Sequence, residues 1–358
     1  MGGIRIRRGV ALEVERARPG VLDVLVEVEG ARARAIAYTD LTGPVDPGDR
    51  LVLNTGAVAL GLGTGGVHFV IAVEGGPEVD PSGAGHAMKL RYTPVQHAVD
   101  MVEDTQRAAL DSFDGLAGKP VVVASLHSAL APACVAAKAL RPDVRVAYVM
   151  TEGGSLALGF SSSVAELRER ALLDVTITCG QAFGGDLEAV NKFSGIVAAA
   201  SVARAELIIV GAGPGNLGTA SRFGFALMEA GENVNAVAAL GGRAILAPRL
   251  SFADARERHR GISHHTITAL GTSALVGAEI ALPTLTAERA GLVRRQLEDA
   301  RLLDVHRAVE VSLGADIEEA LRRPPVGFSS MGRTFEEDPD CFRASAAAAV
   351  LALRGPAG

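Results

Sequence analysis

A glycine-rich segment, GPGNLG at residues 213–218, has the G-x-G-x-x-G spacing of loops that hold phosphate groups. The apolar run Leu207–Val210 comes just before it, so we predict a loop that follows a strand and opens a helix. Glycines there let the backbone approach an anion, and the first turn of a helix offers free N–H groups and partial positive charge. The same pattern also fits a tight turn that binds nothing. The residues expected to bind the ligand are Gly211, Gly213, Gly215, Asn216, Gly218, Thr219 and Arg243.

The surroundings of this loop favour neither a nicotinamide cofactor nor a P-loop. The motif follows the fourth strand of the predicted sheet, whereas the dinucleotide fingerprint follows the first. The next predicted strand, Val234–Leu240, ends in Gly-Gly-Arg and has no acid that could hold a ribose. No lysine follows Gly218, so the sequence lacks the P-loop pattern. Arg243 could instead pair with a phosphate, which favours another small anionic ligand.

Four further residues could transfer protons or bind a divalent metal: His127, Glu152, Asp186 and His264. His127 directly follows the predicted strand Val121–Ser125, and the two acids lie in loops after the next two strands. His264 and His265 stand side by side before the predicted strand Thr266–Leu270. Adjacent strand residues point to opposite faces, so we expect at most one of this pair to act. Structural alternatives stay open, because a lone histidine is often structural and Asp186 fits a helix cap equally well.

The hydrophobic pattern changes near residue 80, which predicts two domains. Before that point, short runs alternate apolar with charged residues, as half-buried antiparallel strands do. These runs are Leu22–Val28, Ala31–Tyr38, Leu51–Leu53 and Val67–Val73. They predict a small all-β, barrel-like domain over residues 1–78, with a sandwich as the alternative. Gly75–Gly85 is the expected linker, and a capping pattern at Thr93 predicts a helix that ends near Gly115.

Residues 79–358 predict an α/β, Rossmann-like domain with a doubly wound, mostly parallel sheet. Apolar runs recur there at the spacing of βαβ units, about 30 residues. A charged helix (Ala287–Arg301), a strand (Ala308–Val311) and an alanine-rich helix form a C-terminal extension. A βα barrel is the weaker alternative, because eight even repeats are not visible. The predicted strands are Val121–Ser125, Val144–Met150, Asp174–Thr178, Leu207–Val210, Val234–Leu240 and Thr266–Leu270.

Small or polar residues follow five of these strands in succession. In a parallel sheet the loops after the strands all lie at the carboxyl edge, and ligands bind there where the strand order switches direction. The sequence therefore predicts a ligand site at this edge.

Composition excludes several classes of partner. The 358 residues carry a net charge of -6 and only 4% aromatic residues, so we expect no nucleic-acid partner. No apolar stretch is long enough to span a bilayer, and residues 1–20 lack a signal-peptide core. The three cysteines, Cys134, Cys179 and Cys341, are too widely spaced for a disulfide framework. We therefore expect a cytoplasmic protein without membrane contact, and a homodimer by default.

Five segments are distinctive in combination: LVLNTGAVALGLGTGGVHFV (51–70), MKLRYTPVQ (88–96), GAGPGNLGT (211–219), SHHT (263–266) and GFSSMGR (327–333). Over nearly the whole chain, this combination resembles a bacterial family known only as a domain of unknown function. The resemblance implies a cytoplasmic bacterial protein of a single architecture. No activity, substrate or catalytic residue comes with it.

The sequence therefore favours a protein that binds, and could turn over, a small anionic or phosphorylated ligand. The sequence leaves the cofactor open, with a divalent metal and a nucleotide as the candidates. A non-catalytic scaffold or regulatory module is the alternative, and an NAD(P)-dependent oxidoreductase is the third option.

Overall fold

The computed structural model describes residues 3–63, 65–76, 78, 85–219 and 221–354. The chain divides into two compact units, Met1–Asp100 and Met101–Gly358. Most of the expected linker Gly75–Gly85, including the expected boundary after residue 78, lies outside the described residues.

The first unit contains the predicted small barrel. Inward side chains such as Val24, Val26 and Leu51 are fully buried and alternate along the strands with exposed residues. The long strand β1 pairs with both β2 and β4, which closes the sheet. A Cβ on Gly9 would lie 2.6 Å from the Glu27 carbonyl oxygen, so only glycine fits that crossing. In the order β1-β2-β3-β5-β4, the strands are β1 (Ile6–Arg18), β2 (Val21–Val28), β3 (Ala31–Tyr38), β5 (His68–Val73) and β4 (Arg50–Asn54).

The predicted helix does not begin at Thr93, and only two short stretches of the range up to Gly115 are helical, Val102–Thr105 and Arg107–Asp111. The Thr93 hydroxyl donates to the Leu90 carbonyl oxygen at 2.7 Å, and the Gln96 side chain accepts from the Tyr92 N–H. Both side chains thus bond to residues before them and stabilise a turn instead of capping a helix. Short elements surround this segment: α1 (Thr39–Thr42), α2 (Gly56–Ala59), β6 (Ala87–Lys89), β7 (His97–Val99), α3 (Val102–Thr105) and α4 (Arg107–Asp111).

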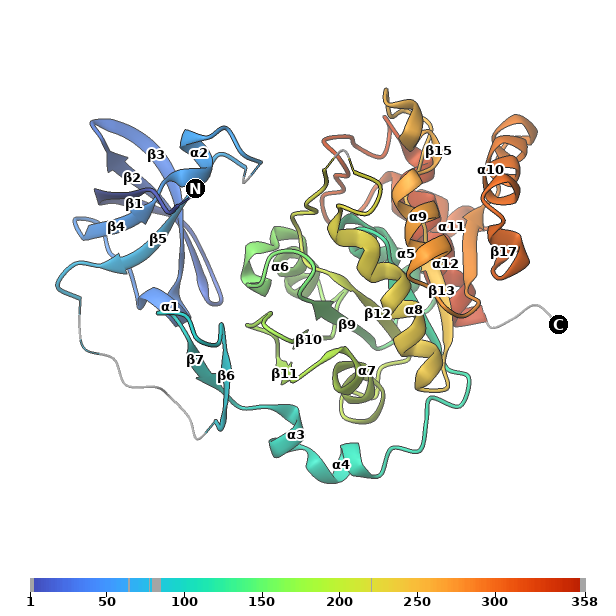
Figure 1. Ribbon diagram of the computed structural model, residues 1–358, viewed down its shortest axis with the longest axis horizontal. Coiled ribbons are helices and arrows are strands. Elements are labelled where there is room, and N and C mark those ends of the chain that lie inside the picture. Colours follow the sequence, from blue (N-terminus) through green and yellow to red (C-terminus); the bar gives the residue numbers. More distant parts are fainter. Residues whose placement is uncertain (1–2, 64, 77, 79–84, 220, 355–358) are drawn as a thin grey trace. The chain divides into compact units, whose positions relative to one another are not determined.

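The second unit is built on an eight-stranded, all-parallel sheet, which confirms the predicted fold class (Figure 1). Every residue of the central strands β8, β9 and β12 except Pro120 is buried, as strands covered on both faces must be. In spatial order the strands are β11 (Leu187–Ala189), β10 (Val175–Cys179), β9 (Val146–Thr151), β12 (Leu207–Ala212), β8 (Pro120–Ala124), β13 (Arg243–Ala247), β16 (Glu279–Pro283) and β17 (Arg307–Val311).

Two of the predicted strands are helices. Val234–Leu240 lies largely in α8 (Glu229–Ala239), and Thr266–Leu270 lies in α9 (His264–Thr272). In α8 the buried residues Ala230, Val234 and Val237 recur at helical spacing and face the sheet.

Helices cover both faces of the sheet. Alternate residues of one strand enter different cores: Val122 of β8 packs on the first face, and Val121 packs on the second. The first face carries α5 (Leu130–Leu140), α6 (Ser162–Glu169), α11 (Ala315–Arg322) and α12 (Pro339–Arg354). The second face carries α7 (Lys192–Ser201), α8, α9 and α10 (Ala287–Asp299).

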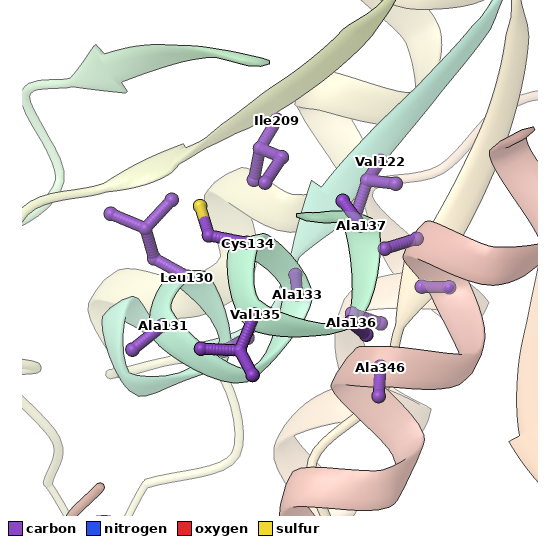
Figure 2. Close-up of a cluster of buried hydrophobic side chains, with 14 of the residues drawn as sticks. Val122, Leu130, Ala131, Ala133, Cys134, Val135, Ala136, Ala137, Ile209 and Ala346 are labelled. Atoms are coloured by element: carbon purple, nitrogen blue, oxygen red, sulfur yellow. The ribbon is translucent and has the colours of Figure 1, made fainter. Parts of the chain in front are cut away.

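The core of the first face is rich in alanine. Figure 2 shows Ala136 of α5 beside Ala346 of α12, with Cys134 on the side of α5 that faces Ile209 and Val122 of the sheet. Such small side chains let two helices approach closely. Burial raises the pKa of the Cys134 thiol, so this cysteine is a packing residue and not a nucleophile.

The strand order switches direction in the middle of the sheet. Strands β8 and β9 continue into helices on the first face, whereas β12 and β13 continue into helices on the second. Because β12 lies between β9 and β8, neighbouring strands send their loops to opposite faces. This divergence at the carboxyl edge creates the position where α/β sheets bind ligands.

Candidate functional site

The loop after β12 does not open a helix, so the prediction that a helix begins directly after GPGNLG is wrong. Gly218 pairs with Phe225, and the Ala226 N–H donates to the Leu217 carbonyl oxygen at 2.8 Å. The chain thus folds back on itself, and α8 begins only at Glu229, after the 3-10 helix η3 (Ala226–Met228). In the described part of this segment, GPGNLG therefore does not form the first turn of a helix, which is the feature that holds a pyrophosphate in dinucleotide-binding loops.

The glycines of this loop are each required for a structural reason, and the reasons differ. A Cβ on Gly213 would lie 2.7 Å from the Ser155 carbonyl oxygen, and one on Gly211 would lie 3.0 Å from Ala124. Both glycines therefore allow neighbouring chain segments to pack closely. Gly215 has a φ of +93° with open space around it, and it serves the turn itself. Asn216 and Thr219 are exposed, and the Thr219 hydroxyl donates to the Gly224 carbonyl oxygen at 2.9 Å.

Three histidines meet after β13, in a group that we call the histidine cluster: His259, His264 and His265. Ring centroids lie 4.8 Å apart for His259 and His264, and 4.3 Å apart for His264 and His265. One ring nitrogen of each residue lies within 4.8 Å of those of the other two. His259 ends the 3-10 helix η4 (Glu257–His259), and the other two begin α9. Because the two adjacent histidines begin a helix and not a strand, the argument from opposite strand faces does not apply to them.

Local hydrogen bonds hold these rings in place. Ser263 caps α9, and its hydroxyl accepts from the His265 N–H at 3.3 Å. The same hydroxyl lies 2.7 Å from Nδ1 of His259, which fixes that ring and leaves its Nε2 for a ligand. A short two-stranded ribbon, β14 (Leu250–Ser251) with β15 (Gly261–Ile262), closes the intervening loop.

The cluster is neutral at pH 7. His259 is 2% exposed and His265 is 8% exposed. Burial, with a smaller contribution from nearby arginines, lowers the pKa of His259 to about 3 and that of His265 to about 4. Burial also lowers the pKa of His264. Neutral imidazoles keep a lone pair, which is the form that binds metals.

Two buried nitrogens of the cluster have no hydrogen-bond partner within the described part of the chain: Nε2 of His264 and Nδ1 of His265. An unpaired buried acceptor costs about 1–3 kcal/mol, so such atoms are uncommon without a ligand. Three histidine nitrogens are a known ligand set of zinc, at about 2.0–2.1 Å from the metal.

The glycine-rich loop adjoins the histidine cluster. Phe225 stacks on His265 with ring centroids 4.1 Å apart and an interplanar angle of 10°. A Cβ on Gly218 would lie 3.7 Å from Cε1 of the same histidine. Ser125, which follows β8, lines a small pocket together with His265, and its buried hydroxyl has no partner among the described residues. The structure thus places Gly218 next to His265, one member of the histidine cluster.

A buried network of charges supports this site. Asp254 is 6% exposed and pairs with Arg249, Arg256 and Arg333. Its hydrogen bonds to Arg256 hold the pKa of the carboxyl well below the usual range. Asp338 accepts from the Ser251 hydroxyl at 2.6 Å, which links β14 to the chain before α12. The loop that carries His259 is thereby anchored at several points.

His127 occupies a different place, on the first face of the sheet. Its Nδ1 lies 3.1 Å from the Tyr148 hydroxyl, and its Nε2 lies 2.7 Å from the Ser161 hydroxyl at the start of α6. Tyr148 in turn donates to the Ala212 carbonyl oxygen at 2.8 Å. Both ring nitrogens are therefore bonded within the protein, and the ring joins three elements of the unit. Burial lowers the pKa of His127 to about 4.

This depressed pKa makes stability depend on pH. The unfolded chain takes up a proton at His127 below about pH 6.5, and the folded chain does so only near pH 4. The contribution of His127 is thus complete above pH 6.5, and about 3 kcal/mol is lost as the pH falls to 4. We expect His127→Gln to flatten the fall of the unfolding free energy between pH 6.5 and 4.5, measured by urea titration. Parallel curves for the variant and the natural protein would contradict this expectation.

The remaining candidates lie apart from the histidine cluster. Glu152 accepts from the Gln181 N–H at 2.7 Å and thereby joins two loops of the carboxyl edge. Asp186 accepts from the Thr176 N–H at 2.8 Å, near the amino end of β10, and pairs with Arg168. Arg243 begins β13 and pairs with Glu279, the first residue of β16. Arg243 and Glu279 therefore lie at the amino edge of the sheet. The glycine-rich loop lies at the opposite, carboxyl edge, so the length of a strand separates it from Arg243.

The sequence interpretation overlooked His259, His265 as a partner of His264, and the Asp254 network. The signal that could have found the cluster is the spacing H-x4-H-H at residues 259–265. A helix start at the capping residue Ser263 would have placed both adjacent histidines in one turn.

Residues 34–349 match a family model described as "Protein of unknown function (DUF3866)". The chain belongs to the DUF3866 family. The match runs from the barrel to α12, and so it covers both the glycine-rich loop and the histidine cluster. A comparison with curated proteins found no match. Among the described residues, no helix is both long enough and apolar enough to cross a membrane.

Proposed function

We propose that this protein is a divalent-metal-dependent enzyme that acts on a small anionic ligand at the carboxyl edge of its eight-stranded sheet. The observation that carries the proposal is the histidine cluster, with two buried nitrogens that lack a partner in the described chain. The unpartnered Ser125 hydroxyl and the adjoining Gly218 support a ligand at the same place.

The ligand set indicates a catalytic rather than a structural metal. Structural zinc sites use four protein ligands, whereas catalytic sites use three and leave a position open. Three neutral imidazoles would also leave the charge of the cation uncompensated, which favours binding of an anion. A metal held in this way polarises a substrate oxygen and lowers the pKa of a water molecule. Hydrolysis or group transfer is therefore the reaction class that we propose.

The protein's own residues would set the geometry of this centre. The Ser263 hydroxyl orients the His259 ring, and the stacked Phe225 ring limits rotation of His265. Phe225 and Leu227 also supply an apolar wall, which excludes water from one side of the cluster. An NAD(P)-dependent reaction gains no support from the loop after β12, since that loop opens no helix.

Thermal unfolding of metal-stripped protein tests the proposal. Zinc at about 100 times its dissociation constant adds about 2.7 kcal/mol of stability, which corresponds to a rise of roughly 5–10 °C in Tm. Magnesium is the matched control, because it prefers oxygen ligands and should leave Tm unchanged. If none of zinc, cobalt, nickel or manganese raises Tm, the proposal fails and the scaffold or regulatory alternative takes its place.

A further inference from the structure

We infer that the Ser125 hydroxyl positions His265 for metal binding, by accepting a hydrogen bond from its Nδ1–H so that Nε2 binds the metal. The inference rests on the proposed function and identifies the nitrogen through which His265 acts. Ser125 is thus a positioning residue, which affects the metal through the histidine. Three features support this role: the pocket that both residues line, the orientation of the His265 ring, and the parallel with His259.

Ser125 and His265 line one small pocket between the sheet and α9. Ser125 directly follows β8, and its N–H donates to the Ala247 carbonyl oxygen at 3.2 Å, which fixes its backbone at the end of the strand. His265 lies in the first turn of α9. The other residues of the pocket are Leu227, Ala230, Leu246, Thr266, Ala269 and Leu270. The serine and the histidine are therefore polar groups in mostly apolar surroundings.

Both side chains have a buried polar atom without a hydrogen-bond partner among the described residues, Oγ of Ser125 and Nδ1 of His265. Ser125 is 3% exposed and His265 is 8% exposed, so bulk solvent does not reach these atoms. The pocket is also too small to admit a water molecule. The Thr266 hydroxyl already accepts from the Arg249 N–H at 3.2 Å. A hydroxyl and an imidazole nitrogen are complementary, so each supplies the partner that the other lacks.

The stacking of Phe225 on His265 leaves the choice of nitrogen open. The two rings are nearly parallel, with an interplanar angle of 10°, so the stacking fixes the plane of the imidazole. A half-turn about the Cβ–Cγ bond keeps that plane and exchanges the positions of Nδ1 and Cδ2. A hydrogen bond at one nitrogen distinguishes these two orientations and sets the tautomer. Ser125 supplies that bond from the pocket.

His259 has the same arrangement within the cluster. Its Nδ1 lies 2.7 Å from the Ser263 hydroxyl, which leaves Nε2 for the metal, and the unpartnered buried atom of His264 is also Nε2. With Ser125 at Nδ1 of His265, all three histidines present Nε2. A metal that takes the lone pair of Nε2 leaves the ring proton on Nδ1, and this N–H then donates to the Ser125 oxygen. The hydrogen bond therefore forms together with metal binding.

Ser125→Ala distinguishes this role from a purely structural one. The hydroxyl makes no hydrogen bond within the described part of the chain, so the Tm of the metal-stripped variant should equal or exceed that of the natural protein. Zinc affinity, measured by competition with a chromophoric chelator, should fall about 10- to 100-fold, as it does for other residues that orient a metal ligand. Ser345→Ala is the matched control. It removes another buried serine hydroxyl of the second unit, which donates to the Cys341 carbonyl oxygen, and it should keep the natural zinc affinity.

NMR of the zinc-loaded protein with isotope-labelled histidine identifies the ligating nitrogen directly. We expect His265 to carry its proton on Nδ1 and to bind zinc through Nε2. Zinc bound through Nδ1 of His265, or an unchanged zinc affinity in Ser125→Ala, would overturn the inference while zinc binding still supports the proposed function. A lower Tm of the metal-stripped variant with natural zinc affinity would assign Ser125 to the fold alone. Failure of zinc to bind the natural protein would remove the proposed function and the inference with it.

Discussion

Zinc affinity is expected to fall by more than about 100-fold when His264 is replaced by alanine. Residues that merely orient a metal ligand change affinity by about 10- to 100-fold, so loss of a ligand itself should exceed that range. The variant should fold, because His264 is only partly buried and begins a helix in which alanine is favourable. Metal analysis after dialysis should show about one equivalent of zinc in the natural protein and a background level in the variant.

A control variant at a histidine outside the cluster tests whether the loss of zinc is specific to the cluster. His97 lies in β7 of the first unit, and His97→Gln should retain the full zinc content. His259→Ala should behave like His264→Ala in metal content, although it also removes the bond to Ser263. Retention of zinc by both cluster variants would show that the three rings are packing residues and would contradict the metal centre.

Replacement of Asp254 by asparagine is expected to give the largest loss of stability. The side chain of Arg249 is 3% exposed, and Asp254 supplies its counter-charge. Removal of one partner of a buried ion pair leaves an uncompensated charge and costs about 3–5 kcal/mol. Thermal unfolding should therefore show a Tm lower by roughly 10 °C. Zinc affinity should also fall by about tenfold, because the loop that carries His259 loses its anchor.

Asp304→Asn is the control for this change. Asp304 forms an ion pair with Arg301 at 3.9 Å, and its side chain is 71% exposed. Exposed ion pairs contribute about 0–1 kcal/mol, so this variant should unfold close to the natural Tm. Similar Tm values for Asp254→Asn and Asp304→Asn would show that the Asp254 network does not stabilise the fold.

The hydrophobic pattern predicted most of the fold, and two of its failures have a common cause. The central strands are continuous apolar runs between loops, and they lie where the sequence indicated. Two short apolar runs, Val234–Leu240 and Thr266–Leu270, are helical instead. A run of this length fits a buried strand and a buried helix equally well, and packing against the sheet decides between them.

The candidate site was harder to predict because two of its three histidines depend on α9. His264 and His265 point toward a common centre only when they share the first turn of a helix. His259 and the buried Asp254 lie in irregular chain around the 3-10 helix η4, where hydrophobic periodicity gives no indication of burial. Gly218 was found from its spacing, but the spacing could not show that its neighbour is a histidine.

The position of α12 has a consequence for synthesis of the protein on the ribosome. This helix packs on α5, β8, β13 and β16, and its alanine-rich surface completes the core of the first face. Residues 339–354 leave the ribosome long after those partners, and so the nascent chain carries an uncovered apolar face during most of its translation. Contacts between such distant segments form slowly, and exposed apolar faces are sites of chaperone binding and aggregation. The second unit must therefore complete its folding after translation of α12, not progressively during it.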